Sequence, residues 1–289
     1  MKIFITGIDG MIGHKIAQSL SEEHTIIGSS RKNIKSEDLG INDCELITHD
    51  FLKDDILEIL DKINPEIIVN CAGITIRRGI NDNYDNTILL NSNLPHRIDD
   101  WTERNQSKLI HFSSDCVFSG EKGNYLDESI PDATDLYGLS KSRGEVKSKN
   151  SLTIRCSIIG REIFNHTELF EWIYSMRGKQ IKGYNNVLYS GVTSIWMGRV
   201  LKKILKYHSE LSGIYNISSE PITKYSLLNL INEHFKLGIE ITRDTKIKSN
   251  KVLISKKFTE ITDINPPNWD DLITEFKEDC IVNKSIYKN

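Results

Sequence analysis

The chain has 289 residues, enough for one large domain or for one domain with a smaller lobe. A hydrophobic content of 38%, a charged fraction of 27% and a net charge of −3 give no reason to expect nucleic acid or an anionic membrane as a partner. No apolar run is long enough for a membrane helix and the first residues enter a strand directly, so we expect a cytoplasmic protein. The five scattered cysteines lack a Cys-x-x-Cys spacing, which argues against disulfides and against a metal site.

The first half of the chain alternates strand-like and helix-like segments. Short apolar runs predict strands at residues 3–6, 24–29, 44–49, 65–71, 108–113 and 152–159. Amphipathic stretches between them predict helices at residues 11–20, 52–63, 87–105 and 136–147. This alternation is typical of an α/β fold of the Rossmann type, a doubly wound parallel sheet with helices on both faces.

The pattern is looser beyond residue 160. Helices are expected at residues 168–176, 196–208 and 225–235, and strands at 213–217 and 240–243. We therefore expect a dinucleotide-binding domain over residues 1–160 and mainly a smaller C-terminal substrate lobe over residues 161–289, with some later segments returning to the main sheet. A homodimer formed through helices beside the sheet is compatible with this fold, but nothing in the sequence requires it.

A glycine-rich turn, TGIDGMIG, follows the first strand and precedes the first helix. Glycine at these positions lets backbone approach a pyrophosphate, and the start of the helix offers free N–H groups and the positive end of the helix dipole. We expect the turn to bind a dinucleotide through Gly7, Asp9, Gly10, Met11, Ile12 and Gly13.

The ends of the next strands indicate which dinucleotide. NAD-binding sheets usually carry an acidic residue after the second strand, whereas this chain has Ser30 and Arg31, which suit a 2′-phosphate. NADPH is therefore favoured over NADH. We also assign cofactor contacts to the residues that follow the third and fourth strands, namely Asp50, Phe51, Cys71, Ala72 and Gly73.

A candidate catalytic set follows the fifth strand. That strand delivers Ser113 and Ser114, and Tyr137 and Lys141 lie four residues apart on one face of the next helix. Hydride transfer to a carbonyl creates an alkoxide that must be protonated, and a tyrosine can supply that proton. A lysine about 4 Å away is worth roughly 4 kcal/mol, which would lower the tyrosine pKa by about three units. Ser114 would hold the carbonyl oxygen, and Lys141 would also anchor the nicotinamide ribose.

At these residues the chain resembles the extended short-chain dehydrogenase/reductases, and among them the dTDP-4-dehydrorhamnose reductases. The resemblance lies in the segments TGIDGMIG, INPEIIVNCAG, HFSSDCVFSG, GNYLDES, DLYGLSKSRGE and LTIRCSIIG. It implies a Rossmann domain with a sugar-nucleotide lobe, a preference for NADPH and reduction of a 4-keto hexose. It also implies that Ser114, Tyr137 and Lys141 are catalytic, that Asn91 helps to build the active site, and that Arg155 and Ser157 lie beside the nicotinamide.

The departures from that family bear on the substrate. Cys116 stands where the family has tyrosine, and Ile158 where it has an aromatic residue. The nucleotide is therefore left open between dTDP and UDP, and a reductase of UDP-linked 4-keto-N-acetylsugars fits as well. We expect substrate contacts at Asp115, Val117, Ile158, Tyr189 and Thr193.

Other activities on the same scaffold remain alternatives. A dehydratase needs a second carboxylate after Asp115, where this chain has Cys116. An epimerase usually retains NAD, which Ser30 and Arg31 disfavour. A relative of the regulatory subunit of methionine adenosyltransferase would bind the nucleotide without catalysis.

Overall fold

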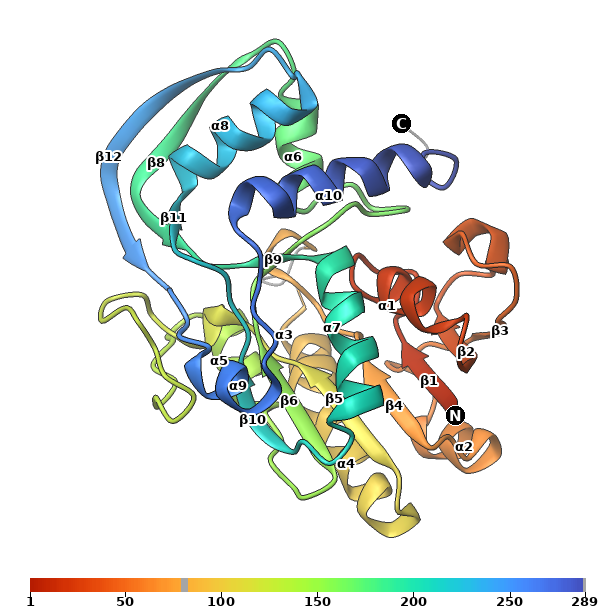
Figure 1. The fold of residues 1–289 in the computed structure, drawn as a ribbon. Helices are drawn as coiled ribbons and strands as arrows, with labels where there is room; N and C mark the ends of the chain where they lie inside the picture. The colour runs from red at the N-terminus through yellow and green to blue at the C-terminus, as the bar shows by residue number, and fades with distance from the viewer. Residues whose placement is uncertain (79–82, 288–289) are drawn as a thin grey trace.

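The computed structural model describes residues 1–78 and 83–287. Seven parallel strands form a central sheet in the order β10-β6-β5-β4-β1-β2-β3 (Figure 1). The strands are β1 (Lys2–Thr6), β2 (Thr25–Ser30), β3 (Glu45–Thr48), β4 (Ile67–Asn70), β5 (Lys108–Phe112), β6 (Ser151–Arg155) and β10 (Gly213–Asn216). The strand order reverses at β1, which lies between β2 and β4, and in such sheets the crevice at the reversal is where ligands bind.

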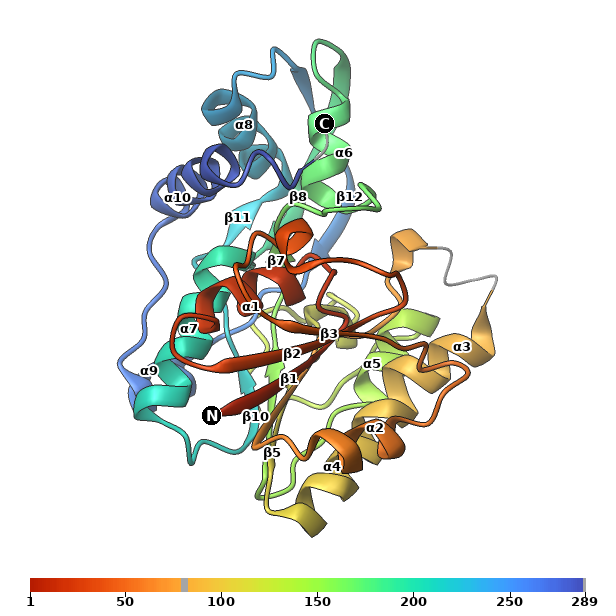
Figure 2. The same ribbon diagram turned by 90° about the vertical axis from the view of Figure 1, so that its right-hand side faces the viewer.

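Helices cover both faces of this sheet (Figure 2). One face carries α1 (Gly13–Leu20) and α7 (Ser194–Tyr207), and the other carries α2 (Ile56–Ile63) and α4 (Leu94–Asn105). Successive residues of β1 serve the two faces, because Ile3 and Ile5 belong to the core with α1 and α7 whereas Phe4 belongs to the core with α2 and α4. The predicted doubly wound α/β architecture is thereby confirmed.

Local chemistry sets the helix boundaries near the cleft. The helix α5 (Leu136–Arg143) begins after Asp135, whose side chain accepts a hydrogen bond from the Gly138 amide at 2.9 Å. It ends at Arg143, four residues earlier than predicted, and at the following residue, Gly144, any side chain would collide with the Asn91 carbonyl. That close approach packs the end of α5 against the preceding helical segment.

Two predicted elements are divided in the structure. The helix predicted over 87–105 is α3 (Tyr84–Ile88), the π-helical turn η4 (Leu89–Asn93) and α4. The strand predicted over 152–159 ends at Arg155, and β7 (Ile158–Ile159) pairs instead with β9 (Val192–Thr193). The alternation of apolar and polar residues continues from Leu152 to Ile158, so periodicity alone could not reveal the break.

The remaining C-terminal elements lie above the carboxyl ends of the central strands (Figure 1). A three-stranded sheet has β8 (Gln180–Tyr189) between β11 (Ile222–Thr223), which is antiparallel to it, and β12 (Glu240–Asn250), which is parallel. With it lie α6 (Leu169–Ser175), α8 (Lys224–Phe235) and α10 (Trp269–Val282). β10 nevertheless belongs to the central sheet, so the assignment of residues 161–289 mainly to a substrate lobe stays a proposal.

Short elements complete the chain: the 3-10 turns η1 (Ser36–Leu39), η2 (Ile76–Arg78) and η5 (Asp115–Val117), and the helix α9 (Lys256–Thr262). Over residues 1–78 and 83–287, no helix has both the length and the apolar character needed to cross a membrane.

Candidate active site

A cleft of about 930 Å3 opens at the carboxyl ends of β1, β4, β5 and β6, beneath β8 and β12. Much of its lining comes from residues that the sequence singled out. These are Gly10, Met11, Ile12, Cys71, Ala72, Gly73, Asn91, Ser113, Ser114, Asp115, Tyr137, Lys141, Ser157, Ile158 and Tyr189. The fold thus brings the glycine turn, the candidate catalytic residues and most of the expected substrate contacts into one space.

The glycine turn has the shape that a pyrophosphate requires. Gly7 has a φ of +61°, and the Gly10 amide donates to its carbonyl at 3.0 Å. A side chain at Gly13 would collide with the same carbonyl, so the turn depends on glycine. No side chain caps the start of α1, and its first turn carries no acidic residue, so an anion is not opposed there. The turn fits the diphosphate of a dinucleotide.

Several expected cofactor contacts lie just outside the cleft lining. Ser30 is buried at the end of β2 and accepts from the Lys32 amide at 3.0 Å, while Arg31 is exposed to solvent. Asp50 accepts from the Leu52 amide at 3.2 Å. Asp9 and Phe51 are half-buried. Asp9 lies in the glycine turn itself and the other positions follow β2 and β3, and their contacts with a cofactor stay a proposal.

The structure does not bring Val117 and Thr193 to the cleft. Val117 is fully buried in a small cluster with Phe118, Tyr125 and Leu253. Thr193 is fully buried and caps α7 by accepting from the Trp196 amide at 3.4 Å. Both side chains are used in packing outside the cleft lining, so their expected contact with substrate stays a prediction that this geometry does not support.

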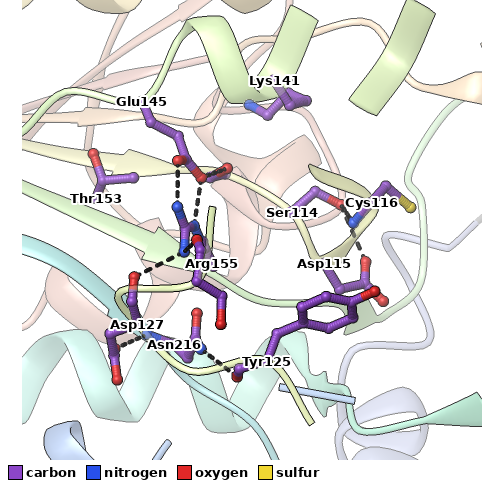
Figure 3. Close-up of polar contacts among 12 residues, drawn as sticks. Ser114, Asp115, Cys116, Tyr125, Asp127, Lys141, Glu145, Thr153, Arg155 and Asn216 are labelled. Atoms are coloured by element: carbon purple, nitrogen blue, oxygen red, sulfur yellow. Dashed lines mark hydrogen bonds and ion pairs between the residues drawn. The ribbon is translucent and has the colours of Figure 1, made fainter. Parts of the chain in front are cut away.

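Ser114, Tyr137 and Lys141 all line the cleft. Figure 3 shows Ser114 and Lys141 with the polar groups around them. Ser114 caps η5, accepting from the Cys116 amide at 3.1 Å and donating to the Asp115 carboxylate at 3.1 Å. The Lys141 ammonium donates to the Phe112 carbonyl at 2.6 Å, one turn of α5 beyond Tyr137. The end of β5 and the first turns of α5 thus hold the three groups together.

Burial dominates the protonation of these groups. It raises the pKa of Tyr137 well above its usual range, with Cys116 adding to the rise and a hydrogen bond with Ser114 opposing it. Burial lowers the pKa of Lys141 to about 8, and the Glu145 carboxylate opposes that change. The sequence argument expected Lys141 to lower the Tyr137 pKa. The main influences on the Tyr137 pKa in this structure come from burial and other groups, and the Lys141 ammonium donates to the Phe112 carbonyl, so the expected lowering stays a prediction.

Asn91 connects two walls of the cleft from inside the π-helical turn. Its amide group donates to the Ile74 carbonyl at 2.9 Å and to the Ser140 hydroxyl at 3.1 Å, and its oxygen accepts from the Ile74 amide at 2.9 Å. The segment after β4 is thereby fixed against α5. Such single π turns are frequent at functional sites.

The sequence reasoning missed the residues that the C-terminal half adds to the cleft. Lys224, at the start of α8, lies over the Tyr189 ring, and burial lowers its pKa to about 8 while Asp115 opposes the change. Burial raises the pKa of Asp115, and Lys224 opposes that. Further lining residues from this half are Glu168, Trp172, Lys182, Tyr184, Ile247 and Ser249. No motif marks them, because only the return of α6, β8, α8 and β12 over the sheet brings them there.

The arrangement can bind an extended anionic ligand and deliver a proton near Ser114. Among the described residues, no group of three or more His, Cys, Asp or Glu side chains is placed to hold a metal ion.

The parallel sheet, the glycine turn at its first strand and the Ser, Tyr and Lys groups in one cleft define a nucleotide-binding fold of the short-chain dehydrogenase/reductase type. A family model described as the RmlD substrate binding domain matches residues 1–166, and the chain belongs to that family.

Two curated relatives illustrate the similarity. A probable low-salt glycan biosynthesis reductase of Haloferax volcanii is 27% identical over 165 residues, which is 55% of this chain and 54% of that relative. The chain thus spans about half the length of that relative. A dTDP-4-dehydrorhamnose reductase of Aggregatibacter actinomycetemcomitans is 26% identical over 235 residues, 78% of this chain and 75% of the relative.

Solved structures share the fold. A hypothetical dTDP-4-dehydrorhamnose reductase from Sulfolobus tokodaii superposes with a TM-score of 0.78 at 25% identity, covering 93% of this chain and 98% of that one. The dTDP-4-dehydrorhamnose reductase of Bacillus anthracis, solved in complex with NADP, has a TM-score of 0.80 at 17% identity, with coverages of 96% and 99%.

Proposed function

We propose that this protein is an NADPH-dependent reductase of the 4-keto group of a nucleotide-linked 6-deoxyhexose. The observation that carries the proposal is the convergence of Ser114, Tyr137 and Lys141 in one cleft with the glycine turn. Similarity to dTDP-4-dehydrorhamnose reductases supports the reaction class, and the NADP complex of a protein with this fold supports the cofactor.

The residues fit the two halves of the cofactor. The turn of Gly10 to Ile12 would hold the diphosphate, Ala72 and Gly73 leave room for the cofactor backbone, and Lys141 would hold the nicotinamide ribose. Ser30 and Arg31 would receive the 2′-phosphate, which is why NADPH is preferred here to NADH. When bound, NADPH supplies the hydride.

The chain's own groups would position the carbonyl and protonate the product. Ser114 would donate a hydrogen bond to the carbonyl oxygen and hold it beside Tyr137. The raised pKa keeps Tyr137 protonated at neutral pH, which is the state that donates a proton to the alkoxide. The Lys141 ammonium then stabilises the phenolate that remains, because an opposite charge nearby favours the ionised form.

The upper part of the cleft suits a nucleotide sugar. Trp172 and Tyr184 offer aromatic faces to a base, and Lys182 and Lys224 offer cations to phosphates. None of these side chains separates dTDP from UDP.

The test is NADPH consumption by the purified protein with freshly generated dTDP- and UDP-linked 4-keto-6-deoxysugars. We expect oxidation with one of them and its loss, by about 100-fold or more, in Tyr137→Phe. Tyr207→Phe removes a phenol hydroxyl from an exposed position on α7 and is the matched control, with wild-type activity expected. Tight NADPH binding without turnover of any sugar would contradict the proposal and favour a binding role, whereas sugar interconversion without net NADPH use would indicate an epimerase.

A further inference from the structure

A buried ion pair lies beside Lys141 and the segment that carries Ser114 (Figure 3). Glu145, two residues beyond α5, accepts from Nε and Nη2 of Arg155 on β6, each at 2.7 Å. The two side chains are only 5% and 3% exposed. Such a bidentate pair fixes the orientation of both groups as well as their separation.

The pair is attached to the strand that carries Ser114. The Ser113 hydroxyl donates to Glu145 Oε1 at 2.7 Å, and Ser113 immediately precedes Ser114. The Lys141 ammonium donates to the carbonyl of Phe112, the residue before Ser113. Glu145 and Lys141 therefore hold two adjacent residues at the end of β5, and the next residue is Ser114.

The two charges of the pair act on different neighbours. The Glu145 carboxylate is the largest influence that opposes the loss of charge on buried Lys141. Arg155 instead directs Nη1 to the carbonyls of Asp127 at 3.0 Å and Ser129 at 3.5 Å. The negative charge of Glu145 thus favours the charged form of Lys141. The guanidinium of Arg155 is instead hydrogen-bonded to the loop that contains Asp127 and Ser129.

Other titratable groups around Lys141 are neutral near pH 7. They come from α5, β5 and the segments after β4 and β6, and they are Tyr137, His111, Cys71 and Cys156. Burial raises the pKa of both thiols and of the phenol, and it lowers the pKa of His111 well below its usual range. Among the described residues around Lys141, Glu145 is therefore the group that carries a compensating charge.

The loop that contains Asp127, which accepts a hydrogen bond from Arg155, is itself hydrogen-bonded to the edge strand β10. The Asp127 carboxylate accepts from the Asn216 amide of β10 at 2.6 Å, and the Asn216 side chain donates to the Tyr125 carbonyl at 2.9 Å. Arg155 is therefore anchored on the side away from the cleft, and Glu145 is held at a fixed place behind β5.

We propose that Glu145 is a positioning residue of the active site, which keeps Lys141 as an ammonium and holds Ser113 and Ser114 in place, with Arg155 orienting it. This inference rests on the proposed reductase function. A purely structural pair would stabilise the fold without influencing the charge of Lys141, so the pH dependence separates the two roles.

The test compares Glu145→Gln with Glu145→Gln/Arg155→Met, which leaves no unpaired guanidinium in the interior. Activity with NADPH should fall at high pH as Lys141 loses its proton. In both variants we expect this basic limb of the pH profile to move down by about one pH unit, roughly a fivefold loss of activity at pH 8 with little change at pH 6. If the single variant does not fold, the double variant decides. Thr153→Val removes buried hydrogen bonds two residues away on β6 and should lower the Tm without moving the limb.

NADPH binding, followed by fluorescence between pH 6 and 9 without a sugar, separates failure of this inference from failure of the proposed function. The affinity should show the same displaced limb in the Glu145 variants, because Lys141 would hold the ribose even if no sugar is turned over. Folded Glu145 variants that keep the wild-type limb in activity and in binding would overturn the positioning role. If the pH dependence of NADPH binding is shifted in the Glu145 variants but no sugar is turned over, the positioning role is supported and only the proposed reductase function is contradicted.

Discussion

Lys224 places its ammonium 3.6 Å from the centre of the Tyr189 ring, inside the cleft and close enough to Asp115 to influence its pKa. The two residues come from α8 and β8, whereas Asp115 follows β5. Lys224 is therefore a desolvated cation beside the residues that would bind the sugar. A partly dehydrated ammonium over an aromatic face is well placed to receive a phosphate oxygen.

We therefore expect Lys224→Met to raise the KM for the nucleotide sugar by about 10- to 100-fold, the equivalent of one charge-assisted hydrogen bond, with a much smaller effect on kcat. Affinity for NADPH should not change, because the turn of Gly10 to Ile12 is formed by other elements. Lys206→Met is the matched control, since Lys206 lies over exposed Tyr207 on the surface at 5.3 Å. A variant whose KM for the sugar equals that of wild type would show that Lys224 does not contact substrate.

The preference for NADPH should depend on Arg31. Its side chain is exposed at the end of β2, where a 2′-phosphate would lie in a sheet of this type. Arg31→Ala should weaken NADPH binding by roughly 10- to 100-fold and leave NADH binding nearly unchanged, because only NADPH carries the phosphate. Dissociation constants for both cofactors would be measured by fluorescence. Arg104→Ala, at the exposed end of α4, should affect neither. Equal weakening of both cofactors would contradict the assignment.

The main sheet could be predicted because its strands are buried on both faces and therefore read as apolar runs such as IIVN and KLIHF. The β8 strand could not, and β12 was expected only over residues 240–243, because their exposed positions carry Lys182, Arg243, Lys246 and Lys248 and no sustained alternation of apolar residues marks them. A register shift between Asp244 and Lys248 disturbs the pattern further.

The candidate site divides in the same way. Gly10, Ser114, Tyr137 and Lys141 follow strands or share a helix face, so chain order alone predicts that they lie together. Lys224 and Trp172 enter the cleft only through the folding of the second half over the first. The Glu145–Arg155 pair joins a residue just beyond α5 to one on β6 ten positions later, and no spacing rule identifies such a contact.

The buried pair of Lys15 and Asp279 joins α1 to α10 and should contribute strongly to stability. The two groups are 2.7 Å apart, and their side chains are 2% and 5% exposed. Lys15→Met leaves the Asp279 carboxylate buried without its partner, so the free energy of unfolding should fall by about 3–5 kcal/mol. Replacing both residues, as Lys15→Met/Asp279→Leu, should recover most of that loss.

Urea unfolding at pH 7 measures these changes. Lys256→Met breaks an exposed pair with Glu260 on α9 and should cost less than about 0.5 kcal/mol. If Lys15→Met were as mild as this control, the buried pair would not be a determinant of stability.

His14 should make the stability of the fold depend on pH below neutrality. Its ring is fully buried between the Gly10 carbonyl at 2.8 Å and the Tyr287 hydroxyl at 3.0 Å, and burial lowers its pKa from 6.5 to about 3. Between about pH 6.5 and pH 3, His14 is therefore protonated in the unfolded chain but neutral in the folded chain. The free energy of unfolding should fall by about 1.4 kcal/mol for each pH unit over this range. His14→Gln removes this contribution and should flatten the profile of urea midpoints between pH 6.5 and 4. His96→Gln, at an exposed position on α4, should leave the wild-type slope unchanged. An unchanged slope in His14→Gln would mean that other groups govern the acid sensitivity.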